Sequence, residues 1–211
     1  MPRAVDHEAR RTQILEALVR LAARNGLHTV TMRSVATETG VSLRLVQYYF
    51  TSKARLMNAA LRYLERRSHE RWQARLDTLH DGHSVREYLD AFFAEALPTD
   101  AESRAFHLVW TSFAVLAMTD PHLAGQPFVE GPNRLEAGLA EILRRAQSVG
   151  TMAASRDADL EAARLVTINH GLGTSVLAGQ RTPAQAMDAF GYHLDQLLGP
   201  APNAAAVSRE R

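Results

Sequence analysis

The chain has 211 residues, of which 46% are apolar, and its formal net charge is +1. This length fits one small domain joined to one domain of ordinary size, and it contains no cysteine, which excludes a disulfide framework, a thiolate metal site and a cysteine nucleophile. The N-terminus is polar and no apolar run reaches the length of a membrane span, so we expect a cytoplasmic protein without membrane contact.

The charge is distributed unevenly along the chain. Residues 1–75 contain 14 Lys and Arg against 6 Asp and Glu, whereas residues 76–211 contain 10 against 17. A basic N-terminal part on an acidic remainder is typical of a head that binds a polyanion and a body that does not. The distribution therefore indicates where a nucleic acid would bind more clearly than the net charge does.

Helical periodicity accounts for the N-terminal part of the chain. A first helix is predicted over 8–25 and ends at Gly26; its apolar face carries Ile14, Leu18, Leu21, Ala22 and Asn25. A second helix runs from its cap, Thr31, to Thr39. Gly40 can supply the positive φ of a tight turn, and Ser42 caps a third helix that runs through Tyr49.

The remainder of the chain also has helical patterns. Ser52 caps a long helix that runs to about Leu79, and Ser84 with Glu87 forms the capping box of the next. Helices are predicted over 85–97, 101–119, 133–147, 157–178 and 183–198, with a loop over 120–132. No alternating strand pattern occurs, so the predicted fold is all-α with about nine helices. The last residues, 200–211, are predicted to be disordered.

Residues 31–53 form a predicted helix-turn-helix. Apolar residues that would bury one side of both helices are Val35, Ala36, Val41, Val46 and Phe50. Leu43, Arg44, Gln47 and Tyr48 then face outward on the second helix, which is the element that enters the major groove in such motifs. Arg is suited to guanine and Gln to adenine, each through two hydrogen bonds.

Other side chains of this segment are suited to phosphate. Hydroxyl, ammonium and capped N–H groups at helix ends donate to phosphate oxygens and set the register on DNA. The predicted DNA-binding residues are Thr31, Arg33, Ser42, Leu43, Arg44, Gln47, Tyr48, Tyr49 and Lys53. The alternative is a surface helix pair whose Arg and Gln side chains are merely solvated. The turn glycine, the two caps and the basic head together favour DNA binding.

Several short motifs resemble the TetR family of transcriptional regulators. They are Asn25-Gly26, Val35-Ala36, Gly40-Val41-Ser42, Val46-Gln47-Tyr48-Tyr49-Phe50 and Ser52-Lys53, and the resemblance that they carry covers about residues 10–60. The helix rhythm beyond them is similar to the betaine-operon-repressor type of C-terminal domain. Three residues depart from the family pattern. Arg44 and Tyr49 are expected to change which operator sequence is preferred. The Thr39 hydroxyl can donate a hydrogen bond to a carbonyl of its own helix.

The resemblance implies a domain organisation and a homodimer. A helix-turn-helix DNA-binding domain would cover residues 1–54 and a ligand-binding and dimerisation domain residues 55–199, with the tail at 200–211. The last two helices would form the dimer interface through Leu165, Ile168, Leu172, Val176, Phe190, Leu194 and Leu197. The alternative is that these stripes pack only on their own body.

The middle helices contain candidates for a small-molecule pocket. Aromatic and polar side chains that could line one are Tyr88, Phe92, Phe106, His107, Trp110, Thr111, Phe113, Asn169 and His170. Apolar walls with a few polar groups describe many ligand sites, but they also describe ordinary cores. Nothing in this set fixes the charge or size of a ligand.

The sequence therefore predicts a DNA-binding transcriptional repressor that a small molecule releases from an inverted-repeat operator. No phosphate loop, nucleophile elbow or HExxH motif is present, so we expect no catalytic residues, no cofactor and no metal. The alternatives are an activator or dual regulator, a helical protein that sequesters a small molecule without binding an operator, and a cofactor-free helical enzyme.

Overall fold

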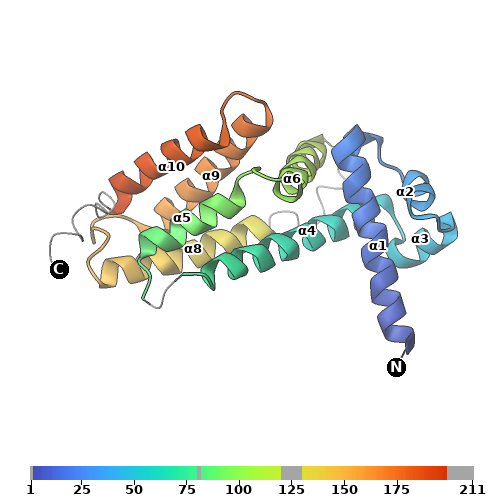
Figure 1. Cartoon of the computed structure of the whole chain (residues 1–211), viewed down its shortest axis with the longest axis horizontal. Helices are drawn as coiled ribbons and strands as arrows, with labels where there is room; N and C mark the ends of the chain where they lie inside the picture. The colour runs from blue at the N-terminus through green and yellow to red at the C-terminus, as the bar shows by residue number, and fades with distance from the viewer. Residues whose placement is uncertain (1, 80–81, 120–129, 199–211) are drawn as a thin grey trace. The chain divides into compact units, whose positions relative to one another are not determined.

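The computed structural model describes residues 2–79, 82–119 and 130–198, and every regular element in these ranges is a helix (Figure 1). The predicted all-α fold is therefore confirmed. In chain order the elements are α1 (Pro2–Asn25), the 3₁₀ helix η1 (Leu27–Thr29), α2 (Met32–Thr39), α3 (Leu43–Phe50), α4 (Lys53–Leu76), α5 (Val85–Ala96), α6 (Ala101–Thr119), α8 (Glu130–Ser148), α9 (Ala158–Leu177) and α10 (Pro183–Leu198). The predicted disordered tail, and residues 120–129 of the predicted loop, lie outside the described residues.

The start of α8 and the end of α4 differ from the predicted helix boundaries. The helix α8 begins at Glu130 rather than residue 133, because Pro132 falls in its first turn, where the missing N–H group needs no partner. The helix α4 ends at Leu76, and Thr78 closes the following turn through its backbone N–H and hydroxyl, which both donate to the Arg75 carbonyl. The predicted capping box is confirmed, since the Ser84 N–H donates to Glu87 Oε2 at 2.7 Å.

The chain divides into two compact units. The first comprises 1–71 with 98–131, and the second comprises 72–97 with 132–211. Packing therefore places α6 with α1 to α4. The predicted functional boundary at residue 54 is a different division and stays a prediction.

The first unit has a core built from α1 to α4 and α6. Ile14 and Leu18 of α1, Val46 and Phe50 of α3, and Phe113 of α6 are buried in it. Most of the predicted face of α1 is confirmed, because Ile14, Leu18, Leu21 and Ala22 are buried. Asn25 is exposed instead, since it is the last residue of α1 and the chain turns away at Gly26, whose φ is 80°.

The second unit packs α5 and α8 to α10 around a separate core. The rings of Phe93 and Phe190 stack with centroids 3.6 Å apart, and both side chains are fully buried. In Figure 1, α9 and α10 run side by side. Arg86 of α5 forms an ion pair with Asp195 of α10, in which the Arg86 Nη1 lies 2.5 Å from the Asp195 Oδ1. No helix in the described ranges is long and apolar enough to cross a bilayer.

Candidate nucleic-acid interface

The helix-turn-helix of α2 and α3 is closed by the predicted caps. The Thr31 hydroxyl accepts from the Ser34 N–H at 3.0 Å, while the Ser34 hydroxyl accepts from the Thr31 N–H at 2.9 Å. The Ser42 hydroxyl accepts from the Leu45 N–H at 3.2 Å at the start of α3. Gly40 has a φ of 68°, a left-handed conformation that a residue with a Cβ rarely adopts.

The hydroxyl of Thr39 forms the predicted bond to the helix. It donates to the carbonyl oxygens of Val35 and Ala36, at 2.8 and 3.1 Å. A hydroxyl at the edge of the core would lose hydrogen bonds to water without such partners. The threonine is thereby accommodated where the family pattern has a small residue.

The apolar side of the motif faces the core of the first unit. Val35, Ala36, Val46 and Phe50 are buried as predicted. Val41 is only partly buried and packs against the edge of this core, because it lies in the turn rather than in a helix. This packing holds α3 with its opposite face toward solvent.

The predicted base-contacting side chains lie on that solvent face. Arg44 and Gln47 are exposed, and Tyr48 is 70% exposed, which is unusual for so large a ring. Leu43 is half-buried and packs against the core at the start of α3. A solvent-facing Arg, Gln and Tyr on one helix can reach base edges and backbone without displacing core residues.

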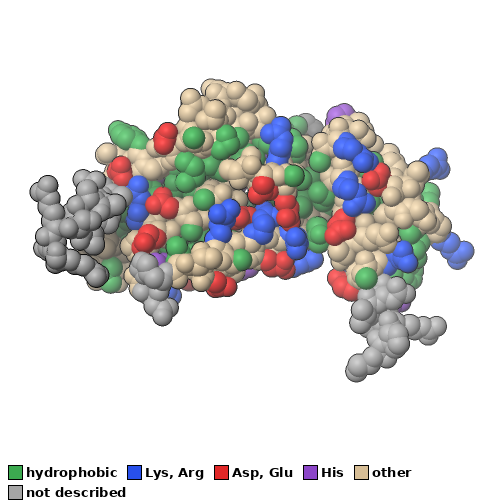
Figure 2. Space-filling model, viewed as in Figure 1, with side chains coloured by type: hydrophobic (Ala, Val, Ile, Leu, Met, Phe, Trp, Pro, Cys, Tyr) green, Lys and Arg blue, Asp and Glu red, His purple; other side chains and the backbone are tan. Residues whose placement is uncertain are grey.

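The predicted phosphate contacts surround the recognition helix. Thr31, Arg33, Ser42 and Lys53 are all exposed. Figure 2 shows basic side chains projecting from the outer edge of the unit beside α2 and α3. Within the described ranges, no carboxylate forms an ion pair with Arg33, Arg44 or Lys53. Their charges are therefore available to an incoming polyanion.

Tyr49 has a partner that the sequence did not suggest. Its hydroxyl is hydrogen-bonded to His7 Nδ1 at 2.7 Å, and the two rings meet edge to face with centroids 6.0 Å apart. His7 lies near the start of α1, before the first predicted helix, so no periodic signal linked it to α3. The contact adds α1 to the elements that border the predicted DNA-binding surface.

Polar contacts fix α1 against its neighbours. Glu38 of α2 receives Arg24 Nη2 at 2.7 Å and Arg20 Nε at 3.4 Å. The hydrogen bond from Arg24 is the largest of the effects that hold the pKa of Glu38 below its usual range. The Tyr63 hydroxyl of α4 donates to Glu16 of α1 at 3.0 Å. These contacts orient the helices around the recognition helix.

Comparison with protein families assigns both parts of the chain. Residues 14–60 match the family described as bacterial regulatory proteins, tetR family, and residues 85–199 match the C-terminal domain of BetI-type transcriptional repressors. The second match alone covers more than half of the chain. The chain belongs to the TetR family.

Individual TetR-family relatives agree with this assignment. The regulator PksA of Bacillus subtilis is 26% identical over 174 residues, covering 82% of this chain and 80% of that protein. The regulator BetI of Serratia proteamaculans is 30% identical over 139 residues, covering 66% of this chain and 69% of that protein. Members of the family are DNA-binding transcriptional regulators and not enzymes.

Solved TetR-family structures have the same fold. A regulator from Saccharomonospora viridis in complex with choline is 31% identical, with a TM-score of 0.74, and the match covers 90% of this chain and 95% of that one. A TetR-family regulator from a Rhodococcus species has a TM-score of 0.79 at 23% identity, covering 90% and 98% of the two chains.

The predicted pocket residues of this TetR-family chain belong to both units. Phe106, His107, Trp110, Thr111 and Phe113 lie on α6 in the first unit, whereas Tyr88, Phe92, Asn169 and His170 lie in the second. Phe113 and Phe92 are buried members of the two separate cores. That all nine line one pocket stays a prediction.

One buried amide in the second unit lacks a partner. Asn169 is 5% exposed, and its Oδ1 accepts no hydrogen bond from the described residues.

Trp72 of α4 packs edge to face on Tyr88 and Phe92, at 5.3 and 5.5 Å between centroids, and sequence reasoning missed it. Burial raises the pKa of Tyr88 to about 12. These groups give the second unit an aromatic cluster and an unsatisfied acceptor.

The predicted dimer residues divide into two groups by burial. Five are buried in the second core of their own chain: Leu165, Val176, Phe190, Leu194 and Leu197. Ile168 and Leu172 are only partly buried, so they retain surface that a second copy could cover. Leu160 on α9 and Tyr192 on α10 are exposed by 65% and 69%. The role of the seven predicted residues in dimerisation stays a prediction.

Proposed function

We propose that the chain is a repressor that binds an inverted-repeat operator as a homodimer and releases it when a small molecule binds. The observation that carries the proposal is the solvent-facing set of Arg44, Gln47 and Tyr48 on a capped recognition helix. Arg33 and Lys53, which no carboxylate in the described ranges neutralises, flank this helix. Such a set serves base and phosphate contacts together. The repressor acts on chromosomal DNA, which places it in the cytoplasm.

The thirteen assigned residues fall into three roles: contact with bases, contact with the DNA backbone, and contact with a second copy. Arg44 and Gln47 contact bases, with Leu43 beside them at the start of the recognition helix. Thr31, Arg33, Ser42, Tyr48, Tyr49 and Lys53 contact the DNA backbone. The surface for the second copy consists of side chains that the core of their own chain leaves at least partly exposed. They are Ile168, Leu172, Tyr192 and Leu160. An isologous contact then fixes the spacing of the two heads.

We propose a quaternary ammonium compound as the class of ligand. The BetI-type C-terminal match and the choline complex of the S. viridis relative support it. The second unit supplies aromatic rings, on Trp72, Tyr88 and Phe92, of the kind that bind such cations by their faces. The buried Glu95 carboxylate lies in the same unit, held by Arg75 Nε at 3.0 Å.

Release requires that the ligand bind the DNA-free state more tightly than the operator-bound state. The helix α4 includes Lys53, next to the recognition helix, and Trp72 of the aromatic cluster, so the same helix carries residues of both regions. A shift of α4 on ligand binding would change the separation of the heads.

The first experiment is a gel shift with the DNA that flanks the chain's own gene, at fixed salt, with choline added in increasing amounts. We expect a specific shift that an unrelated duplex of equal length does not compete away, and its loss as choline increases. A protein that binds choline without shifting any flanking DNA would be a sequestering protein. A shift that choline leaves unchanged would refute the ligand class and leave the repressor assignment standing.

A further inference from the structure

A groove opens between α1 and α4 in the first unit. It has a volume of about 420 Å³ and is lined by Glu8, Arg11, Leu15, Arg55, Asn58, Ala59, Arg62 and Arg66. The lining includes four arginines and one carboxylate. None of these eight residues is among the predicted operator contacts.

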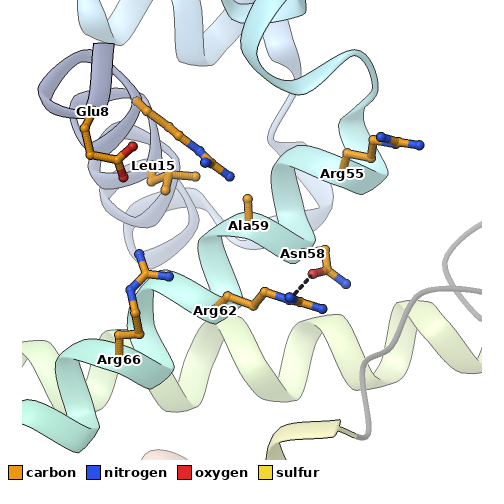
Figure 3. Close-up of a pocket in the computed structure, with 8 residues that line it drawn as sticks. Glu8, Leu15, Arg55, Asn58, Ala59, Arg62 and Arg66 are labelled. Atoms are coloured by element: carbon orange, nitrogen blue, oxygen red, sulfur yellow. Dashed lines mark hydrogen bonds between the residues drawn. The ribbon is translucent and has the colours of Figure 1, made fainter. Parts of the chain in front are cut away.

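Helical spacing produces this groove. On α1, Glu8, Arg11 and Leu15 recur at intervals of three and four residues, and on α4 Arg55, Ala59, Arg62 and Arg66 do the same. Each set therefore lies on one face of its helix. Leu15 of α1 and the small Ala59 of α4 lie between the two helices, and Arg66 extends from α4 toward α1, whereas Arg55 points away from this space (Figure 3).

The arginines are not neutralised in the way that surface arginines usually are. In the described ranges, no carboxylate forms an ion pair with Arg11, Arg55 or Arg66. Arg62 is the exception, because its Nη2 lies 3.1 Å from Glu130 Oε2 and its Nε donates to Asn58 at 3.2 Å. In Figure 3, Arg66 extends from α4 toward α1, where Glu8 is the acidic residue of the lining. The groove therefore carries a net positive charge.

The chemistry of the lining selects a class of ligand. Guanidinium groups bind phosphate oxygens through paired, charge-assisted hydrogen bonds, and several around one concave site favour an anion with more than one charge. Arg11 is also held in place, since its guanidinium carbon lies 5.6 Å from the centroid of the Phe50 ring. The volume is within the range of small-molecule sites.

The far end of the groove is distant from the operator contacts along α4. Lys53 and Arg66 are separated by thirteen positions, which corresponds to about 20 Å of helix.

We propose that this groove is a binding site for a small, multiply charged phosphate-bearing anion, separate from the operator contacts. Arg66 and Arg11 hold the phosphate oxygens, and the apolar surface of Leu15 and Ala59 receives the uncharged part of the molecule. The site joins α1 to α4, the two helices that border the recognition helix through His7 and Lys53.

The test measures binding of inorganic pyrophosphate to the full chain by isothermal titration calorimetry. The ionic strength is kept constant with chloride. Arg66→Gln should weaken pyrophosphate binding at least about fivefold, and adding Arg11→Gln should weaken it further. Arg104→Gln, which removes the same charge from α6 outside the groove, should leave the affinity within about twofold of the original chain. Helical circular dichroism checks the fold of each variant.

Ala59→Leu separates a shaped site from diffuse positive charge. It adds bulk at the apolar surface and keeps every arginine, so it should weaken pyrophosphate binding by several-fold if the anion enters the groove. If Ala59→Leu and Arg66→Gln both bound pyrophosphate as tightly as the original chain, the proposal would be overturned, as it would by undetectable binding to the original chain.

Operator titrations distinguish a free anion from the DNA backbone. Lys53→Ala should weaken operator binding and leave pyrophosphate binding intact, whereas Arg66→Gln should do the reverse. If Arg66→Gln instead weakens operator binding and the chain does not bind pyrophosphate, the phosphate groups at this groove belong to DNA and the proposed separate site is wrong.

Discussion

The Tyr49 hydroxyl at the end of the recognition helix lies 2.7 Å from Nδ1 of His7, forty-two positions earlier in the chain. A tyrosine hydroxyl can accept one hydrogen bond and donate another, so it can hold His7 and a DNA phosphate at once. We therefore predict that His7 orients Tyr49 toward DNA, which would make the segment before the first predicted helix part of the DNA-binding surface.

We expect Tyr49→Phe to weaken operator binding more than His7→Ala does, each by no more than about tenfold, because exposed hydrogen bonds contribute about 0.5–1.5 kcal/mol. His7→Ala should have little effect in the Tyr49→Phe background. Fluorescence anisotropy on the operator measures all four proteins of this cycle. An undiminished effect of His7→Ala in the double variant would show that His7 contacts DNA itself.

Arg44→Ala should reduce specificity at one base pair of each half-site. The side chain is exposed in the first turn of the recognition helix, and a guanidinium that pairs with guanine contributes roughly 1–3 kcal/mol of discrimination. Affinities for a set of operators with single base changes measure this. Arg20→Ala is a poor control because it loses a contact to Glu38, so Arg104→Ala is used instead. A uniform loss on all sequences would assign Arg44 to the backbone.

Lys53→Ala should weaken operator binding with little change in which sequence is preferred. One lost phosphate contact lowers the slope of log affinity against log salt by about 0.9. Tyr48→Phe should also weaken binding without altering preference, and it should leave the slope nearly unchanged, since a hydroxyl carries no charge. The measurement is operator affinity over a series of salt concentrations. An unchanged slope in Lys53→Ala would mean that its ammonium group stays in water.

Leu172→Glu and Leu194→Glu should have different consequences, although both lie on the predicted dimer stripes. Leu172 is partly exposed, so a charge there meets its own copy across the two-fold axis and should give folded monomers that bind the operator weakly. Leu194 is 0% exposed within its own chain, and even truncation of such a leucine to alanine costs about 2–5 kcal/mol, so Leu194→Glu should unfold the second unit.

Light scattering, circular dichroism and operator binding distinguish the two outcomes. A Leu172→Glu protein that remains dimeric and binds DNA would place the interface elsewhere, with Tyr192 and Leu160 as the next positions to substitute.

His193 should make the second unit less stable in mild acid. Burial lowers the pKa of its imidazole below the ordinary 6.5, and nearby Arg164 and Arg156 act in the same direction while Glu161 opposes them. The imidazole Nε2 is buried and has no hydrogen-bond partner in the described ranges. A lowered folded pKa means that its contribution to stability is present above the unfolded pKa and is lost as pH falls through the folded value.

Chemical denaturation at about pH 8 and about pH 5 measures this contribution. His193→Gln should reduce the difference in unfolding free energy between the two pH values. His28→Gln, at an exposed position in the first unit, is the control and should not. An equal difference in the original chain and in His193→Gln would show that other groups cause the acid sensitivity.

The sequence by itself determined the local structure of this protein. Caps at Thr31, Ser42 and Ser84 could be predicted because a hydroxyl beside an apolar-periodic segment satisfies N–H groups that the helix leaves open. The buried side of the helix-turn-helix followed from residue spacing alone, and the motifs around Gly40 and Lys53 identified the family. Short-range interactions decide all of these features.

Only the tertiary structure decided which helices share a core and which side chains meet. Spacing shows that α6 has apolar residues, but not that Phe113 belongs to the core that contains Val46 while Phe92 belongs to the core that contains Phe190. It gives no signal for the contact of His7 with Tyr49 or for the groove that Arg66 borders. The reason is that helical periodicity specifies a direction around one axis, whereas contacts between distant segments depend on how several axes pack together. For the same reason, spacing could not show that Leu194 is already covered by its own chain while Leu172 is not.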